Sequence, residues 1–308
     1  MVPGLRQMLH YIRNYYVHHF NLGYVIAVML VLGLLIYQNY AGTGVSDLLA
    51  TKELPPWLSR YILYCLPFFT AYLLQPLFFR PLRFQYKKGF WILLLLAPAF
   101  FTLRVQLNLS DLLPTSANNT PEDLSNSSVA NLFFTSLLLL LPAALCWYSL
   151  EGRLQHGYGL AKTTNLKTYL LLLCIMLPFI ALASSNPTFL EQYPRAFKAM
   201  KNPESRTLVG WLSFEILYAF DFFSTEFFFR SFLILAFVRL SGVHAIIPAA
   251  CFYCCIHLDK PLAEAVSSFF GGWLLGIISY YSKSIWGGLL IHVGIAWFME
   301  LFAWLQHQ

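Results

Sequence analysis

Charged residues are scarce in this chain. Asp, Glu, Lys and Arg together account for 11% of its 308 residues, whereas hydrophobic residues account for 58% and Phe, Tyr and Trp for 18%. A soluble domain of this length cannot bury so much apolar surface. The composition therefore excludes a soluble globular protein and predicts an all-α, polytopic integral membrane protein.

Familiar catalytic motifs are also absent. The sequence has no His-Glu-x-x-His zinc helix, no Gly-x-Gly-Asp aspartyl motif and no Gly-x-Ser-Gly serine site, which excludes three well-known classes of intramembrane protease. It has neither a P-loop nor a Gly-x-Gly-x-x-Gly turn, so nucleotide-driven transport is excluded as well.

The sequence shows no disulfide framework. Its six cysteines all lie within or beside apolar stretches, where each behaves as a small hydrophobic residue: Cys65, Cys146, Cys174, Cys251, Cys254 and Cys255. The last three and His257 are close enough in sequence to suggest a metal site. At 100° per residue, however, these cysteines share one helix face and His257 projects away from it. We therefore predict that the cysteines pack between helices.

The formal net charge is +6, but the basic residues are not arranged for binding nucleic acid. They recur in every second interval between apolar segments: Arg6 and Arg13, then residues 80–88, then Arg153, Lys162 and Lys167. The positive-inside rule predicts that such intervals are cytoplasmic. We expect a cytoplasmic N-terminus and no nucleic-acid partner.

Apolar segments recur along the whole chain and predict eight or nine transmembrane helices. They lie approximately at 24–37, 61–79, 90–103, 130–150, 169–183, 209–240, 245–257, 262–281 and 285–305. The stretch 209–240 is about 48 Å long if it is one helix. It is either one tilted helix or two pieces broken near Ser224 and Thr225.

The N-terminal region has a different pattern from the rest. Apolar residues at helical spacing over residues 1–22, with Arg6 and Arg13 between them, predict an amphipathic helix at the membrane interface. Small residues at 41–44 follow the first apolar run, so a cleaved signal peptide is an alternative. The long aromatic region before that run favours an uncleaved span. We expect transmembrane helices over 23–206 and a separate core over 207–308.

Glu226 and Arg230 lie one helical turn apart inside an apolar run, DFFSTEFFFRSFLILAF. A charged side chain at bilayer depth costs roughly 2.5 to 3.5 kcal/mol. An ion pair buried there is often no more stable than apolar residues in its place. Arg230 either only neutralises Glu226 for burial or shares a functional site with it, and the energetic cost favours a functional site.

His257 lies at the end of the segment that follows. Tyr253 precedes it by one turn, and Pro261 closes or opens a helix soon after it, so His257 is predicted near a helix end. It is either a histidine solvated at the interface or a site residue. Glu264 either faces back towards His257 or places a negative charge at a helix N-terminus.

His292 lies in the last apolar segment, after Gly287 and Gly288. No carboxylate lies one turn beyond it, because that position is Ala296. Glu300 is on roughly the same face but about 12 Å further along the axis, too far for direct contact in a straight helix.

In this order, the residues resemble the motifs of the CPBP family, which comprises CAAX proteases and bacteriocin-processing (Abi-type) enzymes. The family has Glu-Glu-x-x-x-Arg, Phe-x-x-x-His and His-x-x-x-Asn or Asp on successive membrane helices. The corresponding stretches here are Thr225-Glu226-Phe-Phe-Phe-Arg230, Tyr253-x-x-x-His257 and His292-x-x-x-Ala296. The resemblance covers about residues 207–305.

The resemblance implies an intramembrane endopeptidase in which a glutamate and a histidine activate water. The motif places Glu226 at the second, supporting glutamate beside Arg230. We nevertheless expect Glu226 to act as base, His257 as its partner, His292 as stabiliser or ligand, and Arg230 as the cation that keeps Glu226 ionised. Both a zinc and a metal-free mechanism are known alternatives for the family. Glu226, His257, His292 and Glu264 are the candidate metal ligands.

Two positions depart from the family pattern. Thr225 replaces the first glutamate, which the family uses as the water-activating base, and Ala296 replaces the final Asn or Asp. Either Glu226 has taken over the role of the base with the aid of Glu264, or the protein is a catalytically inactive homologue that acts as a membrane scaffold, partner-binding or immunity protein. The expected partners are membrane lipid and a membrane peptide or protein, in a bacterial inner (cytoplasmic) membrane.

Overall fold

The computed structural model describes residues 3–42, 44, 54–79, 88–109, 121–151, 159–162, 166–200, 206–236 and 238–307. Over these ranges the chain is helical and has no β-strand, and Gly159 and Leu160 form isolated bridges with Ser284. The predicted all-α class is confirmed.

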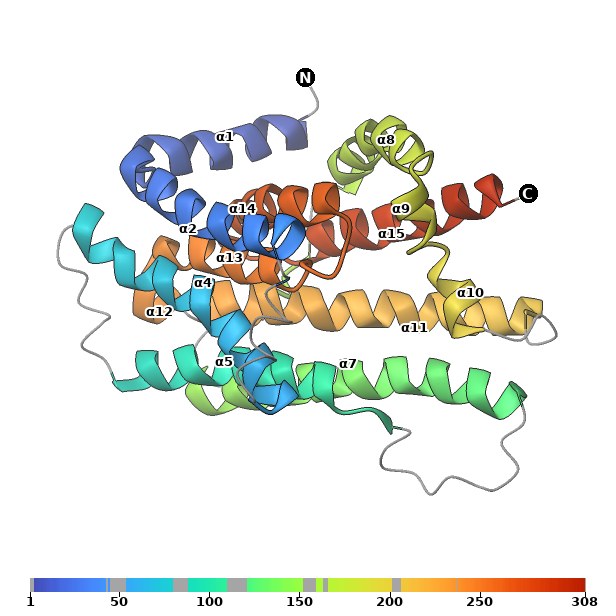
Figure 1. Cartoon of the computed structure of the whole chain (residues 1–308). Coiled ribbons are helices and arrows are strands. Elements are labelled where there is room, and N and C mark those ends of the chain that lie inside the picture. The colour runs from blue at the N-terminus through green and yellow to red at the C-terminus, as the bar shows by residue number, and fades with distance from the viewer. Residues whose placement is uncertain are drawn as a thin grey trace.

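The helices follow one another along the chain as shown in Figure 1. They are α1 (Pro3–His18), α2 (Leu22–Ala41), α4 (Pro56–Phe78), α5 (Lys88–Gln106), α7 (Pro121–Glu151), α8 (Leu166–Ala183), α9 (Pro187–Leu190), α10 (Arg195–Ala199), α11 (Leu208–Glu226), the π-helix η3 (Phe227–Ala236), α12 (Val238–Ser241), the 3-10 helix η4 (Gly242–Ala245), α13 (Ile246–Cys255), α14 (Leu262–Ser282) and α15 (Trp286–Gln306).

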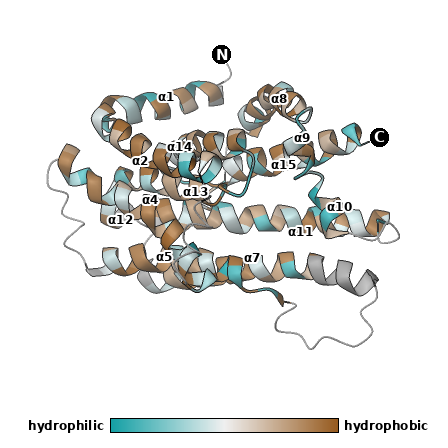
Figure 2. Cartoon of the chain, viewed as in Figure 1, coloured by the Kyte–Doolittle hydropathy of each residue, from teal (hydrophilic) through white to brown (hydrophobic). Residues whose placement is uncertain are grey.

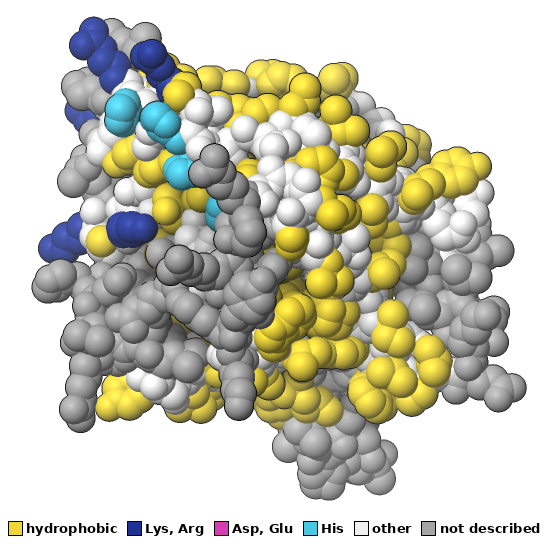
Figure 3. Space-filling view, turned by 90° about the vertical axis from the view of Figure 1, so that its left-hand side faces the viewer, with side chains coloured by type: hydrophobic (Ala, Val, Ile, Leu, Met, Phe, Trp, Pro, Cys, Tyr) yellow, Lys and Arg dark blue, Asp and Glu magenta, His cyan; other side chains and the backbone are white. Residues whose placement is uncertain are grey.

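Seven of the described helices are long and apolar enough to cross a membrane: α2, α4, α5, α7, α8, α14 and α15. Their outer faces are apolar, with Leu34, Leu77 and Leu182 between 69% and 75% exposed. Hydrophobic residues extend along most helices in Figure 2 and cover a broad area in Figure 3, where Lys, Arg and His gather towards one end. The chain is a polytopic integral membrane protein.

The segment predicted at 209–240 contains no break at Ser224 or Thr225. It runs as α11 between α7 and α15 (Figure 1). After Glu226 the helix does not end but changes from α-helical to π-helical winding, as η3. The alternative of two broken pieces is wrong at that point. A π-helical stretch closes its hydrogen bonds over five residues and often occurs at functional sites.

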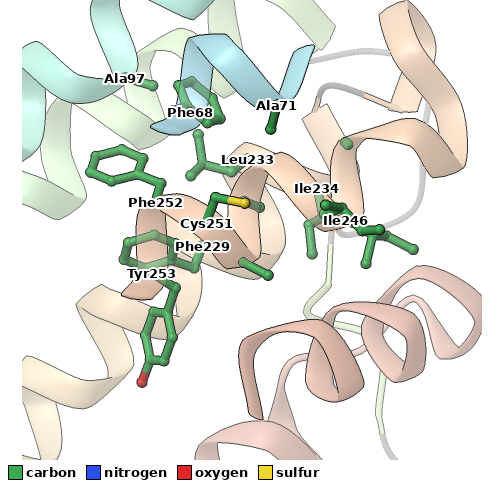
Figure 4. Packing of buried hydrophobic residues seen from close by; sticks show 14 of the residues in the cluster. Phe68, Ala71, Ala97, Phe229, Leu233, Ile234, Ile246, Cys251, Phe252 and Tyr253 are labelled. Atoms are coloured by element: carbon green, nitrogen blue, oxygen red, sulfur yellow. The ribbon is translucent and has the colours of Figure 1, made fainter. Parts of the chain in front are cut away.

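α13 lies at the centre of the apolar core. All ten of its residues are buried, and it packs against α4, α14 and η3. Figure 4 shows part of this cluster, including Phe68 on α4 and Phe229 on η3. At about 1.5 Å per residue, ten residues are too short to cross a bilayer. Protein rather than lipid therefore surrounds α13.

The predicted N-terminal helix is present as α1, and it packs on α14 through a stack of Tyr11 on Tyr281 and an edge contact of Tyr15 with Trp273. Its position at the membrane interface and the three predicted domain limits stay predictions. The basic residues at 80–87 and Arg153 lie outside the described residues, so the orientation of the chain also stays a prediction.

Candidate functional site

Glu226 and Arg230 are both completely buried, at the junction of α11 and η3. Arg230 Nε lies 3.6 Å from Glu226 Oε2, which is close enough for an ion pair but too long for a good hydrogen bond. Within the described part of the chain, Glu226 Oε2 and all three guanidinium nitrogens have no hydrogen-bond partner. Buried polar groups are normally hydrogen-bonded, and such exceptions often mark functional sites.

His292 on α15 meets the other oxygen of this carboxylate. Its Nδ1 lies 3.0 Å from Glu226 Oε1, and its Nε2 lies 2.8 Å from the hydroxyl of Tyr253 on α13. The ring of Phe222 packs against the imidazole at 4.4 Å. Three helices thus bring a carboxylate, an imidazole and a phenol into one continuous hydrogen-bonded chain.

The direction of these hydrogen bonds follows from their chemistry. A carboxylate beside a guanidinium only accepts, so Nδ1 of His292 donates to Glu226. A neutral imidazole then has a lone pair at Nε2, which accepts from the Tyr253 hydroxyl. His292 is therefore held with its basic nitrogen pointing away from Glu226.

Gly287 and Gly288 allow α15 to approach the site closely. A Cβ at position 288 would lie 2.9 Å from Glu226 Oε2, and one at position 287 would lie 2.0 Å from the ring of Tyr169. Both distances are shorter than real Cβ contacts. The two glycines thus provide room for the carboxylate and for a neighbouring ring.

His257 lies in the turn between α13 and α14, where the sequence predicts a helix end. Its Nδ1 donates to the carbonyl oxygen of Tyr253 over 2.8 Å, and the two rings are 4.7 Å apart. Partial burial lowers the pKa of His257, so the imidazole is neutral at physiological pH. His257 adjoins the chain of hydrogen bonds through Tyr253 but does not bond to Glu226 or His292.

Glu264 and Glu300 have partners elsewhere. Glu264, in the first turn of α14, accepts a hydrogen bond from the Tyr193 hydroxyl over 3.2 Å rather than facing His257. The Glu300 carboxylate accepts from the backbone N–H groups of Arg195 and Ala196 at 2.8 and 3.0 Å. Neither carboxylate belongs to the hydrogen-bonded chain around His292.

Thr225, at the position of the family's first glutamate, joins a second polar cluster. Arg104 on α5 donates from Nη1 to the Thr225 hydroxyl over 2.9 Å and from Nη2 to both Asp221 oxygens over 2.6 and 2.7 Å. Ser136 on α7 also donates to Asp221, over 2.8 Å. This cluster was not predicted from the sequence, although Asp221 opens the same apolar run and Arg104 ends an apolar segment.

Ala296, at the position of the family's final Asn or Asp, is buried in an apolar cluster with Ala196, Met200, Phe214 and Tyr218. The methyl group offers no hydrogen-bond donor, and the surrounding side chains fill the space around it. At the position where the family has Asn or Asp, this protein therefore has an apolar contact.

The described residues do not form a metal site. No group of three His, Cys, Asp or Glu side chains in the described ranges is placed to hold one ion. Glu226 bonds to His292, whereas Glu264 bonds to Tyr193 outside the hydrogen-bonded chain. The set of Glu226, His257, His292 and Glu264 therefore does not fit zinc, which takes three or four ligands in common. Cys251, Cys254 and Cys255 are buried in the core, where cysteines pack as apolar residues.

The C-terminal part of the chain matches a known family. Residues 207–298 match the family model described as "Type II CAAX prenyl endopeptidase Rce1-like". The match includes the segments around Glu226, His257 and His292, and it confirms the resemblance to the CPBP family. Comparison with curated proteins finds no match, nor does comparison with solved structures.

Proposed function

We propose, from the match of residues 207–298 to the Rce1-like family model, that the chain is an intramembrane endopeptidase of the CPBP type. It hydrolyses a peptide bond in a membrane-associated peptide or protein. The observation that chiefly supports the proposal is the hydrogen bond of 3.0 Å between Glu226 and His292, which joins two of the family's motif residues.

Glu226 acts through His292 rather than alone. A carboxylate that fixes a histidine through Nδ1 leaves Nε2 as the basic nitrogen, as in Ser-His-Asp hydrolases. The pair takes a proton from the attacking water and later returns it to the amine that leaves. Arg230, 3.6 Å from the carboxylate, supplies the positive charge that favours the ionised form of Glu226.

His257 supports the reaction from the neighbouring turn. Its neutral imidazole donates from Nδ1 to a backbone carbonyl, so Nε2 has a lone pair. This nitrogen makes no hydrogen bond with any residue in the described ranges, and the side chain is only partly buried. Nε2 of His257 is thus available to hold the attacking water.

Thr225 and Ala296 support a second function, that of a catalytically inactive homologue which binds a membrane partner. Thr225 is hydrogen-bonded to Arg104, and Ala296 is packed among apolar side chains. Neither position therefore offers the group that the family motif has there. Under this alternative, Glu226 and Arg230 stabilise a binding surface and cleave nothing.

The test is turnover by the purified full chain in liposomes. We expect it to cleave a membrane peptide, and a prenylated CAAX peptide is the first substrate to assay because the family description names that class. Glu226→Gln and His292→Ala should each lower kcat at least about 100-fold, the usual contribution of acid–base catalysis. Glu191→Gln and His10→Ala, which change exposed residues, are the matched controls.

Two outcomes contradict the proposal. Wild-type turnover in both Glu226→Gln and His292→Ala would exclude the acid–base pair. If the wild-type protein instead cleaves nothing but is recovered from detergent with a stoichiometric membrane partner, the inactive homologue is the correct assignment.

A further inference from the structure

Tyr253 departs from the family motif in a way that adds a functional group. The motif Phe-x-x-x-His has a phenylalanine where this chain has Tyr253, so the sequence adds one hydroxyl to the site. In Figure 4 the ring of Tyr253 lies at the edge of the apolar cluster and its hydroxyl points away from the other labelled residues. That hydroxyl lies 2.8 Å from Nε2 of His292.

The surroundings hold the phenol in place. Its ring makes an edge contact with Phe229 at 4.9 Å, and the guanidinium of Arg230 lies 5.1 Å from the ring centre. A Cβ at Gly272 would lie 3.2 Å from the ring, so α14 also packs tightly against it. Tyr253 is 6% exposed, whereas the His292 side chain is 16% exposed. The hydroxyl thus has a fixed position beside an imidazole that reaches the surface.

We propose that Tyr253 is a catalytic residue whose hydroxyl passes the proton of the attacking water to Nε2 of His292. The inference rests on the proposed endopeptidase function and deepens it. A chain of Glu226, His292 and Tyr253 has the order of the triad in serine hydrolases, with water rather than the hydroxyl oxygen as the nucleophile.

The phenol stays neutral during the proton transfers, because it gains one proton as it gives up another. One O–H bond of water breaks as its oxygen bonds to the carbonyl carbon, and the Tyr253 oxygen accepts this proton while its own proton moves to Nε2. Tyr253 stays neutral, and His292 becomes an imidazolium beside the carboxylate of Glu226. When the C–N bond breaks, the proton returns along the same route to the amine.

This role also accounts for the departure at Thr225. The family's first glutamate would contact water directly, whereas Thr225 is hydrogen-bonded to Arg104 and its hydroxyl cannot act as a base at neutral pH. Glu226, in turn, is fully buried. Tyr253 connects the basic nitrogen of His292 with the attacking water.

Tyr253→Phe tests the inference, because it restores the residue of the family motif and removes a single oxygen. We expect kcat to fall about 100-fold, the low end for acid–base catalysis, with KM and the unfolding midpoint unchanged. Tyr64→Phe is the matched control: Tyr64 is buried in the same core, with its ring 5.5 Å from that of Phe252.

A second measurement separates catalysis from packing. In the relay, two protons move in the same step. A plot of kcat against the fraction of D2O should therefore be curved for the wild type and for Tyr64→Phe. Tyr253→Phe should give a straight line. A straight line for the wild type, or wild-type kcat in Tyr253→Phe, overturns the relay and leaves the endopeptidase function intact. A wild-type protein that cleaves no peptide overturns the proposed function itself.

Discussion

Arg104 and Thr225 are joined by a hydrogen bond of 2.9 Å, although 121 positions separate them in the chain. The bond connects α5 to the last turn of α11, one residue before Glu226. At the position where the family motif has a base, this protein therefore has a link between two helices. The same guanidinium also binds Asp221, so a single side chain positions the end of α11.

Arg104→Met should destabilise the protein. It leaves the Asp221 carboxylate, 12% exposed, without its cation, and removing one partner of a buried hydrogen bond costs about 1–3 kcal/mol. The measurement is the free energy of unfolding in detergent. Arg13→Met, which changes an exposed arginine, is the control and should alter stability by less than about 0.5 kcal/mol.

The double variant Arg104→Met/Asp221→Leu should recover part of this loss, because it removes both charges instead of leaving one buried. If the two substitutions are simply additive, Arg104 and Asp221 do not interact in the native protein.

Gly288→Ala should reduce turnover. The new Cβ would lie 2.9 Å from Glu226 Oε2, so the carboxylate has to move and lose its alignment with His292. A misplacement approaching 1 Å lowers kcat about 100-fold. Gly271→Ala provides the comparison, because a Cβ there meets nothing within 4 Å. Equal kcat values for the two variants would show that the carboxylate is not positioned by close contact with α15.

Chelation should leave the activity unchanged. No three ligand side chains in the described ranges converge on one point, and the nitrogen of His292 that faces Glu226 is already hydrogen-bonded. The assay compares kcat before and after dialysis against a strong zinc chelator. Loss of turnover with recovery on adding zinc would contradict this prediction.

The membrane class and the helices could be predicted from the sequence because they depend on residues that are close together in the chain. Apolar runs and scarce charge determine them directly, and the cost of burying Glu226 and Arg230 marks that turn without any knowledge of the fold. His257 was likewise expected at a helix end because Pro261 follows it, and it lies in the turn between α13 and α14.

The rest depends on contacts between distant helices. The pairing of Arg104 with Asp221 joins residues on α5 and α11, and no periodicity indicates it. The hydrogen bond between Tyr253 and His292 joins α13 to α15, and the sequence alone does not indicate it. The π-helical winding after Glu226 could not be predicted from the sequence either, because its residues are as apolar as those of an ordinary helix.

The enclosure of α13 has a consequence for how the bilayer acts on this protein. All ten residues of α13 are buried among other helices, so acyl chains do not touch this segment, which holds Tyr253 and leads to His257. A change in bilayer thickness therefore acts on the outer spans and leaves the distance between Tyr253 and His257 unchanged. The bilayer should then act on the site through α15, the lipid-facing span that carries His292, and not through α13.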